Sequence, residues 1–149
     1  HNHILAYEHI AHNVVLGSRV IMSNAATLAG HVIVEDHAVV GGLAAVHQFC
    51  RIGKMSIIGG CSKVVQDVPP FMLVDGNPAV TRTVNKVGLD RNAVPEAAQA
   101  ALRQAYKILF REELPLAEAL AKVEQELPAL PDVQHLVQFV RTSERGIIK

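Results

Sequence analysis

Residues 4–68 read ILAYEHIAHNVVLGSRVIMSNAATLAGHVIVEDHAVVGGLAAVHQFCRIGKMSIIGGCSKVVQDV, and this stretch decides the fold. Every sixth residue is aliphatic, at Ile4, Ile10, Leu16, Met22, Leu28, Val34, Val40, Val46, Ile52, Ile58 and Val64. The residue four places after each of these is small in every repeat except the first. A period of six fits neither an amphipathic helix nor an alternating strand. It is typical of the hexapeptide repeat of a parallel β-helix.

Each hexapeptide is expected to form one face of a triangular coil, so that three hexapeptides complete a coil of 18 residues. The large and the small residue of each repeat point into the prism, where their alternating sizes let stacked coils interdigitate. Residues 1–69 are therefore predicted to form a β solenoid of three to four coils, about 4.8 Å apart. Four glycines that directly follow an aliphatic position are expected at corners with an unusual φ: Gly17, Gly41, Gly53 and Gly59.

The composition changes at Pro69-Pro70. Seven of the eight histidines precede this point, and all seven prolines lie from Pro69 onward. Apolar residues at roughly helical spacing then predict helices over 94–110, 115–127 and 132–141. We expect residues 70–90 to be a connecting loop and residues 91–149 to form a small α-helical C-terminal domain.

Composition and charge exclude several classes of protein. Lys+Arg and Asp+Glu are both 14, which argues against a nucleic-acid binder with a basic face. No apolar run approaches the ~20 residues of a membrane helix, so stable membrane insertion is not expected. Cys50 and Cys61 are too few for a disulfide framework and suit the reducing cytoplasm. The chain begins at His1, and we expect it to be the C-terminal portion of a longer protein.

An 18-residue coil stacks residues that are 18 apart in sequence into one column. His12, Gly30 and Gln48 share such a column, and the slots beside it hold further polar side chains. The set predicted to converge on one corner is His12, Asn13, Gly30, His31, His47 and Gln48. A second column holds Asn24, Gly42 and Gly60, whose two glycines would leave a shallow groove without side chains.

The predicted cluster has a definite chemical use. A neutral imidazole can accept a proton near pH 7, and an adjacent polar group can fix its tautomer. Backbone N–H groups of corner glycines can stabilise an oxyanion. Together these groups can move an acyl group onto a hydroxyl. Two alternatives stay open: a hexapeptide metalloenzyme of the γ-carbonic-anhydrase type, since three histidines can hold Zn²⁺, and a non-catalytic trimeric scaffold.

Several strings resemble one family: HIAH at 9–12, NAATLAGHV at 24–32, GGLAAVHQFC at 41–50, QDVPP at 66–70, and SERG at 143–146. The family is that of the acyl-[acyl-carrier-protein]–UDP-N-acetylglucosamine O-acyltransferases, which start lipid A biosynthesis. The resemblance covers essentially the whole chain. It implies a homotrimer of left-handed β-helices with active sites in the clefts between subunits. It also implies transfer of a 3-hydroxyacyl chain from acyl carrier protein to the 3-hydroxyl of UDP-N-acetylglucosamine.

The resemblance also implies roles for individual residues. His12 would be the general base, and Gly30 would supply the N–H for the oxyanion. Substrate-binding positions would be His9, Asn13, His31, His47, Gln48, Asn85 and Arg91, the last two at the nucleotide. Gly42 and Gly60 would line the acyl channel, where the bare Gly60 suits a long chain. No metal or resident cofactor is implied, because the acyl donor is carried on the phosphopantetheine of acyl carrier protein.

The chain departs from the family pattern at three points. The residue after the base is usually Asp, whereas here it is Asn13, which stabilises an imidazolium less than a carboxylate would. Arg91 is followed by Asn92 where a second Arg is common, so one phosphate contact is expected to be lost. The family's N-terminal coils are missing. The choice between a 3-hydroxyl and a 3-amino acceptor stays open, and with it the sister N-acyltransferase.

Overall fold

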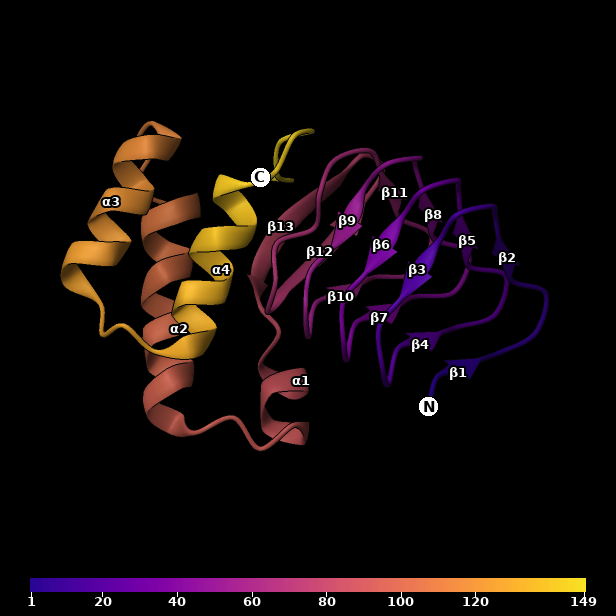
Figure 1. Ribbon diagram of the computed structural model, residues 1–149, viewed down its shortest axis with the longest axis horizontal. Coiled ribbons are helices and arrows are strands. Elements are labelled where there is room, and N and C mark those ends of the chain that lie inside the picture. The colour runs from indigo at the N-terminus through magenta and orange to yellow at the C-terminus, as the bar shows by residue number, and fades with distance from the viewer.

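The computed structural model describes residues 1–149 as a coiled stack of short strands with a group of helices at one end (Figure 1). Eleven two-residue strands occupy the faces of the coils and run in three parallel sheets. The first contains β1 (His3–Ile4), β4 (Ile21–Met22), β7 (Val39–Val40) and β10 (Ile57–Ile58), the second β2 (His9–Ile10), β5 (Thr27–Leu28), β8 (Ala45–Val46) and β11 (Lys63–Val64), and the third β3 (Val15–Leu16), β6 (Ile33–Val34) and β9 (Arg51–Ile52). The predicted β solenoid is confirmed.

The interior of the solenoid follows the predicted two-row pattern. Large aliphatic side chains such as Leu28 and Ile58 are fully buried, and so are small residues such as Ala26 and Ala38. The inward-facing hydroxyl of Ser56 is satisfied locally, because it donates to the carbonyl oxygen of Gly53 at 2.7 Å. Burial of these two rows is the main source of stability in the solenoid.

The corners depart from the prediction. The unusual φ occurs at every sixth residue, with values from 54° to 65°, at Tyr7, Asn13, Arg19, Ala25, His31, His37, Leu43, Phe49, Met55 and Cys61. The glycines that we predicted there are not in the left-handed region. They serve close packing instead: a Cβ at Gly41 would lie 2.5 Å from the carbonyl oxygen of Ile58, and one at Gly53 would overlap Pro70.

Residues 70–90 do not form the predicted loop. β12 (Met72–Gly76) adds to β10 in parallel, and β13 (Ala79–Val84) pairs with β12 in antiparallel fashion. The short helix α1 (Lys86–Arg91) follows. Alternating burial explains β12, because Met72 and Val74 are both fully buried, Met72 against the helices and Val74 in the solenoid core. The Gly-Asn-Pro at 76–78, which we interpreted as part of a loop, is the hairpin turn.

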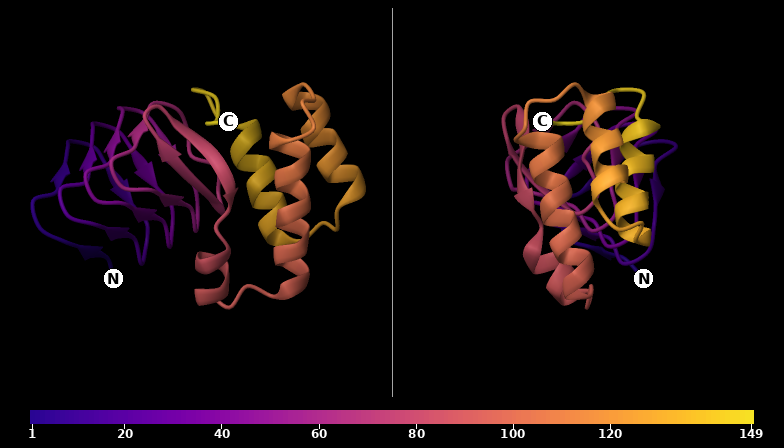
Figure 2. Two further views of the ribbon diagram at one scale, coloured as in Figure 1. Left: turned by 180° about the vertical axis from the view of Figure 1, so that it is seen from behind. Right: turned by 90° about the vertical axis from the view of Figure 1, so that its left-hand side faces the viewer.

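The three predicted helices are confirmed as α2 (Glu96–Phe110), α3 (Leu116–Glu126) and α4 (Pro131–Arg141). They pack on one another through one apolar face each and cover the end of the solenoid (Figure 2). Phe71 and Met72 join this helical core from the solenoid side. No helix combines the length and apolar character that crossing a membrane requires.

The C-terminal segment returns to the solenoid, which the sequence analysis did not foresee. Asp67 and Ile147 form an isolated parallel bridge, and Ile148 is buried in the solenoid core. The buried carboxylate of Asp67 accepts hydrogen bonds from the backbone N–H of Arg51 at 2.8 Å and from the hydroxyl of Ser143 at 2.6 Å. This segment therefore fastens the helical end to the last coil.

Candidate functional site

The predicted corner column is present. The backbone N–H of His31 donates to the carbonyl oxygen of His12 at 3.0 Å, and that of Phe49 donates to Gly30 at 3.1 Å. These bonds stack successive coils in register, so His12, Gly30 and Gln48 occupy equivalent positions one coil apart. Residues from three separate repeats thus lie in one column, as the 18-residue spacing predicts.

Aromatic rings form a stack along this corner. The rings of His12 and His31 meet edge to face with centroids 5.0 Å apart. His31 in turn stacks on Phe49 with centroids 4.8 Å apart and planes 10° from parallel. Both His31 and Phe49 occupy left-handed corner positions, which turn their side chains outward. The stack holds the imidazole of His31 against that of His12.

His12 also has a polar partner. Its Nδ1 lies 3.0 Å from Oδ1 of Asn13. Because an amide oxygen only accepts, this contact places the ring proton on Nδ1 and leaves Nε2 free to take a proton from a substrate. The pair is exposed, so Nε2 is open to a ligand. The amide of Asn13 thus fixes the tautomer without contributing a negative charge.

Gly30 lies directly beneath the His12 ring. A Cβ at this position would lie 2.6 Å from Cε1 and 2.7 Å from Nε2 of His12. The backbone N–H of Gly30 has no hydrogen-bond acceptor within the chain. An unpaired backbone N–H and an imidazole nitrogen without a partner, on residues this close together, are groups that acyl transfer to a hydroxyl can use.

The remaining histidines of the prediction flank this pair. His47 Nδ1 lies 3.1 Å from the carbonyl oxygen of Gln48, and both residues are exposed at the same corner. His9 is exposed on β2 and makes no side-chain hydrogen bond. A cavity of about 700 Å³ extends from the stack toward the C-terminal segment. Its lining includes His31, Phe49, Arg51, Asp67 and Arg145.

The C-terminal segment also contributes to this cavity, which the sequence did not indicate. The guanidinium of Arg145 donates to the carbonyl oxygen of Val65 at 3.0 Å, across 80 residues of chain. Gln66 Nε2 donates to the carbonyl oxygen of Arg145 at 3.1 Å. The SERG string was part of the family resemblance, but no periodic signal indicated where it would fold.

The second column is also formed. The backbone N–H of Leu43 donates to Asn24 at 3.0 Å, and that of Cys61 donates to Gly42 at 2.9 Å. A Cβ at Gly60 would meet one atom only, the carbonyl oxygen of Gly42 at 3.2 Å. A Cβ at Gly42 would lie 3.2 Å from the carbonyl oxygen of Asn24 and 3.9 Å from Cβ of Ser23. The surface at both glycines therefore consists mainly of backbone.

Asn85 and Arg91 lie elsewhere. Asn85 is buried and caps α1: its Oδ1 accepts from the N–H of Gly88 at 3.1 Å, and its Nδ2 donates to Met55 at 2.8 Å. One Oδ1 lone pair and one Nδ2 hydrogen remain for a ligand. Arg91 is the last residue of α1 and is exposed. Both line a cavity of about 370 Å³ that shares no residue with the cavity at His31. Within a single chain, Asn85 and Arg91 therefore do not lie at the corner of His12.

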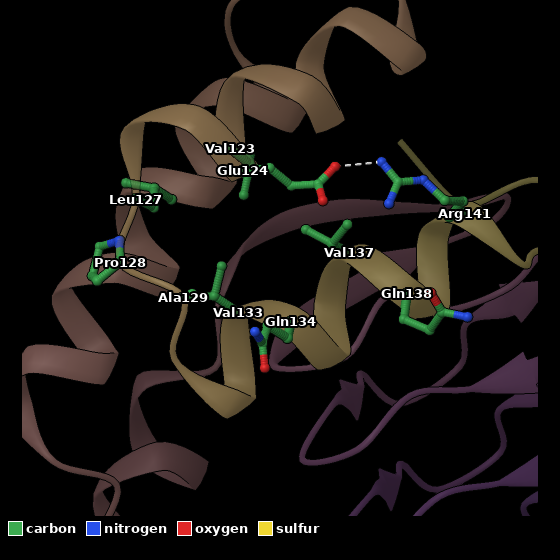
Figure 3. Close-up of a pocket in the computed structure, with 10 residues that line it drawn as sticks. All are labelled: Val123, Glu124, Leu127, Pro128, Ala129, Val133, Gln134, Val137, Gln138 and Arg141. Atoms are coloured by element: carbon green, nitrogen blue, oxygen red, sulfur yellow. Dashed lines mark hydrogen bonds and ion pairs between the residues drawn. The ribbon is translucent and has the colours of Figure 1, made fainter.

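A further cavity of about 330 Å³ lies between α3 and α4 (Figure 3). Glu124 and Arg141 form an ion pair at 2.5 Å beside it. None of the predicted site residues lines this cavity. Within the chain, no three His, Cys, Asp or Glu side chains lie in an arrangement that could hold a metal ion.

Comparison with known proteins agrees with the geometry. A family model described as UDP N-acetylglucosamine O-acyltransferase, domain 2, matches residues 67–148. The chain is 47% identical over 149 residues to the acyl-[acyl-carrier-protein]–UDP-N-acetylglucosamine O-acyltransferase of Thiobacillus denitrificans, and 46% identical over 153 residues to that of Verminephrobacter eiseniae. These matches take in 100% and 99% of the chain, respectively.

Solved structures give the same result. UDP-N-acetylglucosamine acyltransferase from Campylobacter jejuni superimposes with a TM-score of 0.92 at 39% identity, over 99% of this chain and 57% of that one. LpxA from Acinetobacter baumannii superimposes with a TM-score of 0.95 at 37% identity, over 100% of this chain and 58% of that one. The chain spans 58% of the length of the two curated relatives. From its repeat, its corner chemistry and these matches, the chain belongs to the UDP-N-acetylglucosamine O-acyltransferase family.

Proposed function

We propose that this chain supplies the catalytic base to an enzyme that transfers a 3-hydroxyacyl group from acyl carrier protein to the 3-hydroxyl of UDP-N-acetylglucosamine. This would be the first step of lipid A biosynthesis. The observation that carries the proposal is the contact between His12 and Gly30, in which a free imidazole nitrogen faces a backbone that has no side chain. The family membership supports the choice of substrates.

In the proposed reaction, Nε2 of His12 takes the proton of the sugar 3-hydroxyl, and the hydroxyl oxygen attacks the thioester carbonyl carbon. The N–H of Gly30 donates to the resulting oxyanion. When the tetrahedral intermediate collapses, the C–S bond breaks and the imidazolium returns its proton to the departing phosphopantetheine thiolate. His9, Asn13, His31, His47 and Gln48 would orient the base and its two substrates.

The separation of two residue sets supports a homotrimer. Asn85 and Arg91 line one cavity, and the His12 corner lies beside another. A site that needs both sets is complete only when a second chain brings its α1 to the first chain's corner. The outward sheet faces carry exposed apolar residues, such as Val15 at 57% and Ile33 at 43%, that suit contact between copies.

The acyl chain would run along the column of Gly42 and Gly60, where no side chain obstructs it. Acyl carrier protein as the donor implies a cytoplasmic reaction, in keeping with two free cysteines, Cys50 and Cys61.

The test replaces His12 by Ala in the full-length protein and follows acyl transfer to UDP-N-acetylglucosamine. We expect a loss of roughly 10²–10⁴-fold, as for removal of a general base. Gln134→Ala, on the exposed side of α4, is the control and should leave the rate unchanged. A loss of less than about fivefold for His12→Ala would exclude the assigned role.

A further inference from the structure

The cavity beside α1 is lined by basic side chains and by no acidic one. It lies between the outward face of the sheet that contains β1, β4, β7 and β10 and the helix α1. Its polar lining consists of His1, His3, Arg19, His37, Asn85, Arg91 and Asn92, with Ile21, Val39, Ile57, Val87 and Gly88 as the apolar part. No Asp or Glu is among these residues, although the chain as a whole has equal numbers of acidic and basic groups.

Arg19 and His37 stand one above the other on the solenoid side. Both occupy left-handed corner positions, with φ of 57° and 61°. Backbone hydrogen bonds between coils hold both residues. The N–H of Arg19 donates to the carbonyl oxygen of His1 at 2.9 Å, and the N–H of His37 donates to that of Ser18 at 2.9 Å. Their separation along the axis is therefore one coil, about 4.8 Å. Neither side chain forms a hydrogen bond or ion pair within the chain, so both are available to a ligand.

The opposite wall is held at a fixed distance from this corner. Asn85 donates to the carbonyl oxygen of Met55, which occupies the next position in the column of Arg19 and His37. At the end of α1, Arg91 has no ion-pair partner. The neighbouring carboxylate of Asp90 is engaged by Lys86 at 2.8 Å and by Gln99 at 3.0 Å. Nothing in the cavity neutralises Arg19 or Arg91.

Two unpaired guanidiniums and three imidazoles around one cavity, with no carboxylate, are suited to a ligand with adjacent anionic groups. We propose that Arg19 and His37 bind the diphosphate of the nucleotide sugar together with Arg91. This inference rests on the proposed function, which supplies the ligand. Arg19 reaches the cavity from the solenoid and provides the second cation that the helix lacks, because the residue after Arg91 is Asn92. The apolar residues of the sheet face the remainder of the nucleotide.

The experiment titrates the full-length protein with UDP and, separately, with uridine by calorimetry. We expect Arg19→Gln to weaken UDP binding by about 10-fold or more, because a charge-assisted hydrogen bond is lost, and to leave uridine binding unchanged. His37→Gln should give a smaller loss of the same kind. Arg19→Lys keeps the charge but not the planar guanidinium, and should weaken UDP binding less than Arg19→Gln does. The control is Arg103→Gln on α2, where the guanidinium pairs with Glu96 and faces solvent.

The outcomes separate this inference from the proposed function. If Arg91→Gln weakens UDP binding while Arg19→Gln and His37→Gln do not, the roles of Arg19 and His37 are refuted and the proposed function stands. An equal loss of UDP and uridine binding in Arg19→Gln would show a change of shape rather than a lost phosphate contact, and would also refute the inference. If the unaltered protein binds neither UDP nor UDP-N-acetylglucosamine, the proposed function itself fails.

Discussion

Gly30 packs against the imidazole of His12 so closely that a Cβ on Gly30 would lie 2.6 Å from Cε1 of the ring. The ring is the movable end of an exposed side chain, so Gly30→Ala should displace it rather than unfold the coil. We expect the proposed acyl transfer to fall by about 100-fold, the effect of misplacing a general base by roughly 1 Å. The melting temperature should change little, since Gly30 does not have a left-handed φ.

The double variant provides the check. If Gly30→Ala acts by displacing His12, the combination with His12→Ala should be hardly slower than His12→Ala alone. Fully multiplicative losses would show that Gly30 contributes independently of the base.

Asn13 offers a second prediction, on pH dependence. Asn13→Asp replaces the amide oxygen at 3.0 Å from Nδ1 by a carboxylate. An opposite charge at this distance favours the imidazolium, so the acid limb of the pH profile of kcat/KM should move up by about one pH unit. Asn24→Asp, on the second column, adds the same charge away from the base and should not move the limb. An unchanged limb in Asn13→Asp would contradict the assigned contact.

A third prediction concerns the Glu35 carboxylate, which links β6 to α4. Burial alone raises its pKa, but the hydrogen bond and charge of His135, the N–H of Lys54 and the charge of Arg51 outweigh burial and lower the pKa below its ordinary 4.5. Because the folded-state pKa is the lower one, the ionised group stabilises the fold above about pH 4.5. This contribution is lost as the pH falls through the folded-state value.

Glu35→Gln should therefore reduce the free energy of unfolding by about 1–2 kcal/mol at pH 7, as measured by urea denaturation. The difference from the unaltered protein should shrink as the pH falls below about 4.5. Glu118→Gln, on the exposed side of α3, is the matched control and should show no such convergence. A difference that stays constant with pH would rule out the ionised carboxylate as the cause.

The fourth prediction concerns Asp67, which is 1% exposed and accepts two hydrogen bonds. Asp67→Ala leaves a backbone N–H and the Ser143 hydroxyl without acceptors and should reduce the free energy of unfolding by about 2–3 kcal/mol. Ser143→Ala removes only one of the bonds and should cost about 1 kcal/mol. Trypsin should cleave after Arg145 faster in Asp67→Ala than in the unaltered protein. Cleavage at the unaltered rate would show that the Asp67 carboxylate does not hold the C-terminal segment.

The two cysteines supply a fifth prediction. Burial raises the pKa of the Cys50 thiol to about 11, so it remains protonated and unreactive in the folded chain. Cys61 is exposed. A thiol reagent at pH 8 should therefore modify one cysteine per folded chain and two after denaturation, with mass spectrometry identifying Cys61 as the first. Rapid modification of Cys50 in the folded protein would contradict the placement of its side chain in the core.

The solenoid and its corner could be predicted because a fixed repeat converts sequence spacing directly into position. His12, Asn13, Gly30 and His31 were placed together by this means, and the structure has them in contact. The left-handed corners were misplaced because glycine was expected to mark them, whereas the stacked backbone imposes that conformation on any residue type.

Contacts between the solenoid and the C-terminal part of the chain could not be predicted from the repeat. His135 pairs with Glu35 across 100 residues, and Ser143 reaches Asp67 across 76. Such pairings depend on how the helices dock, which no local pattern encodes. The cavity of Arg19 and His37 was missed for the same reason, since its second wall is α1, within a segment interpreted as a loop.

The strict coil length has an evolutionary implication. Loss of one residue between His12 and Gly30 would turn the inward row of that coil to the surface and move the glycine out from under the imidazole. Selection should therefore remove insertions and deletions within the coils, even though the corner at His12 is exposed to solvent. Point changes at the corners should be tolerated, because every residue there already adopts the same backbone shape. A lineage can then exchange the chemistry of its corners one side chain at a time while the scaffold stays unaltered.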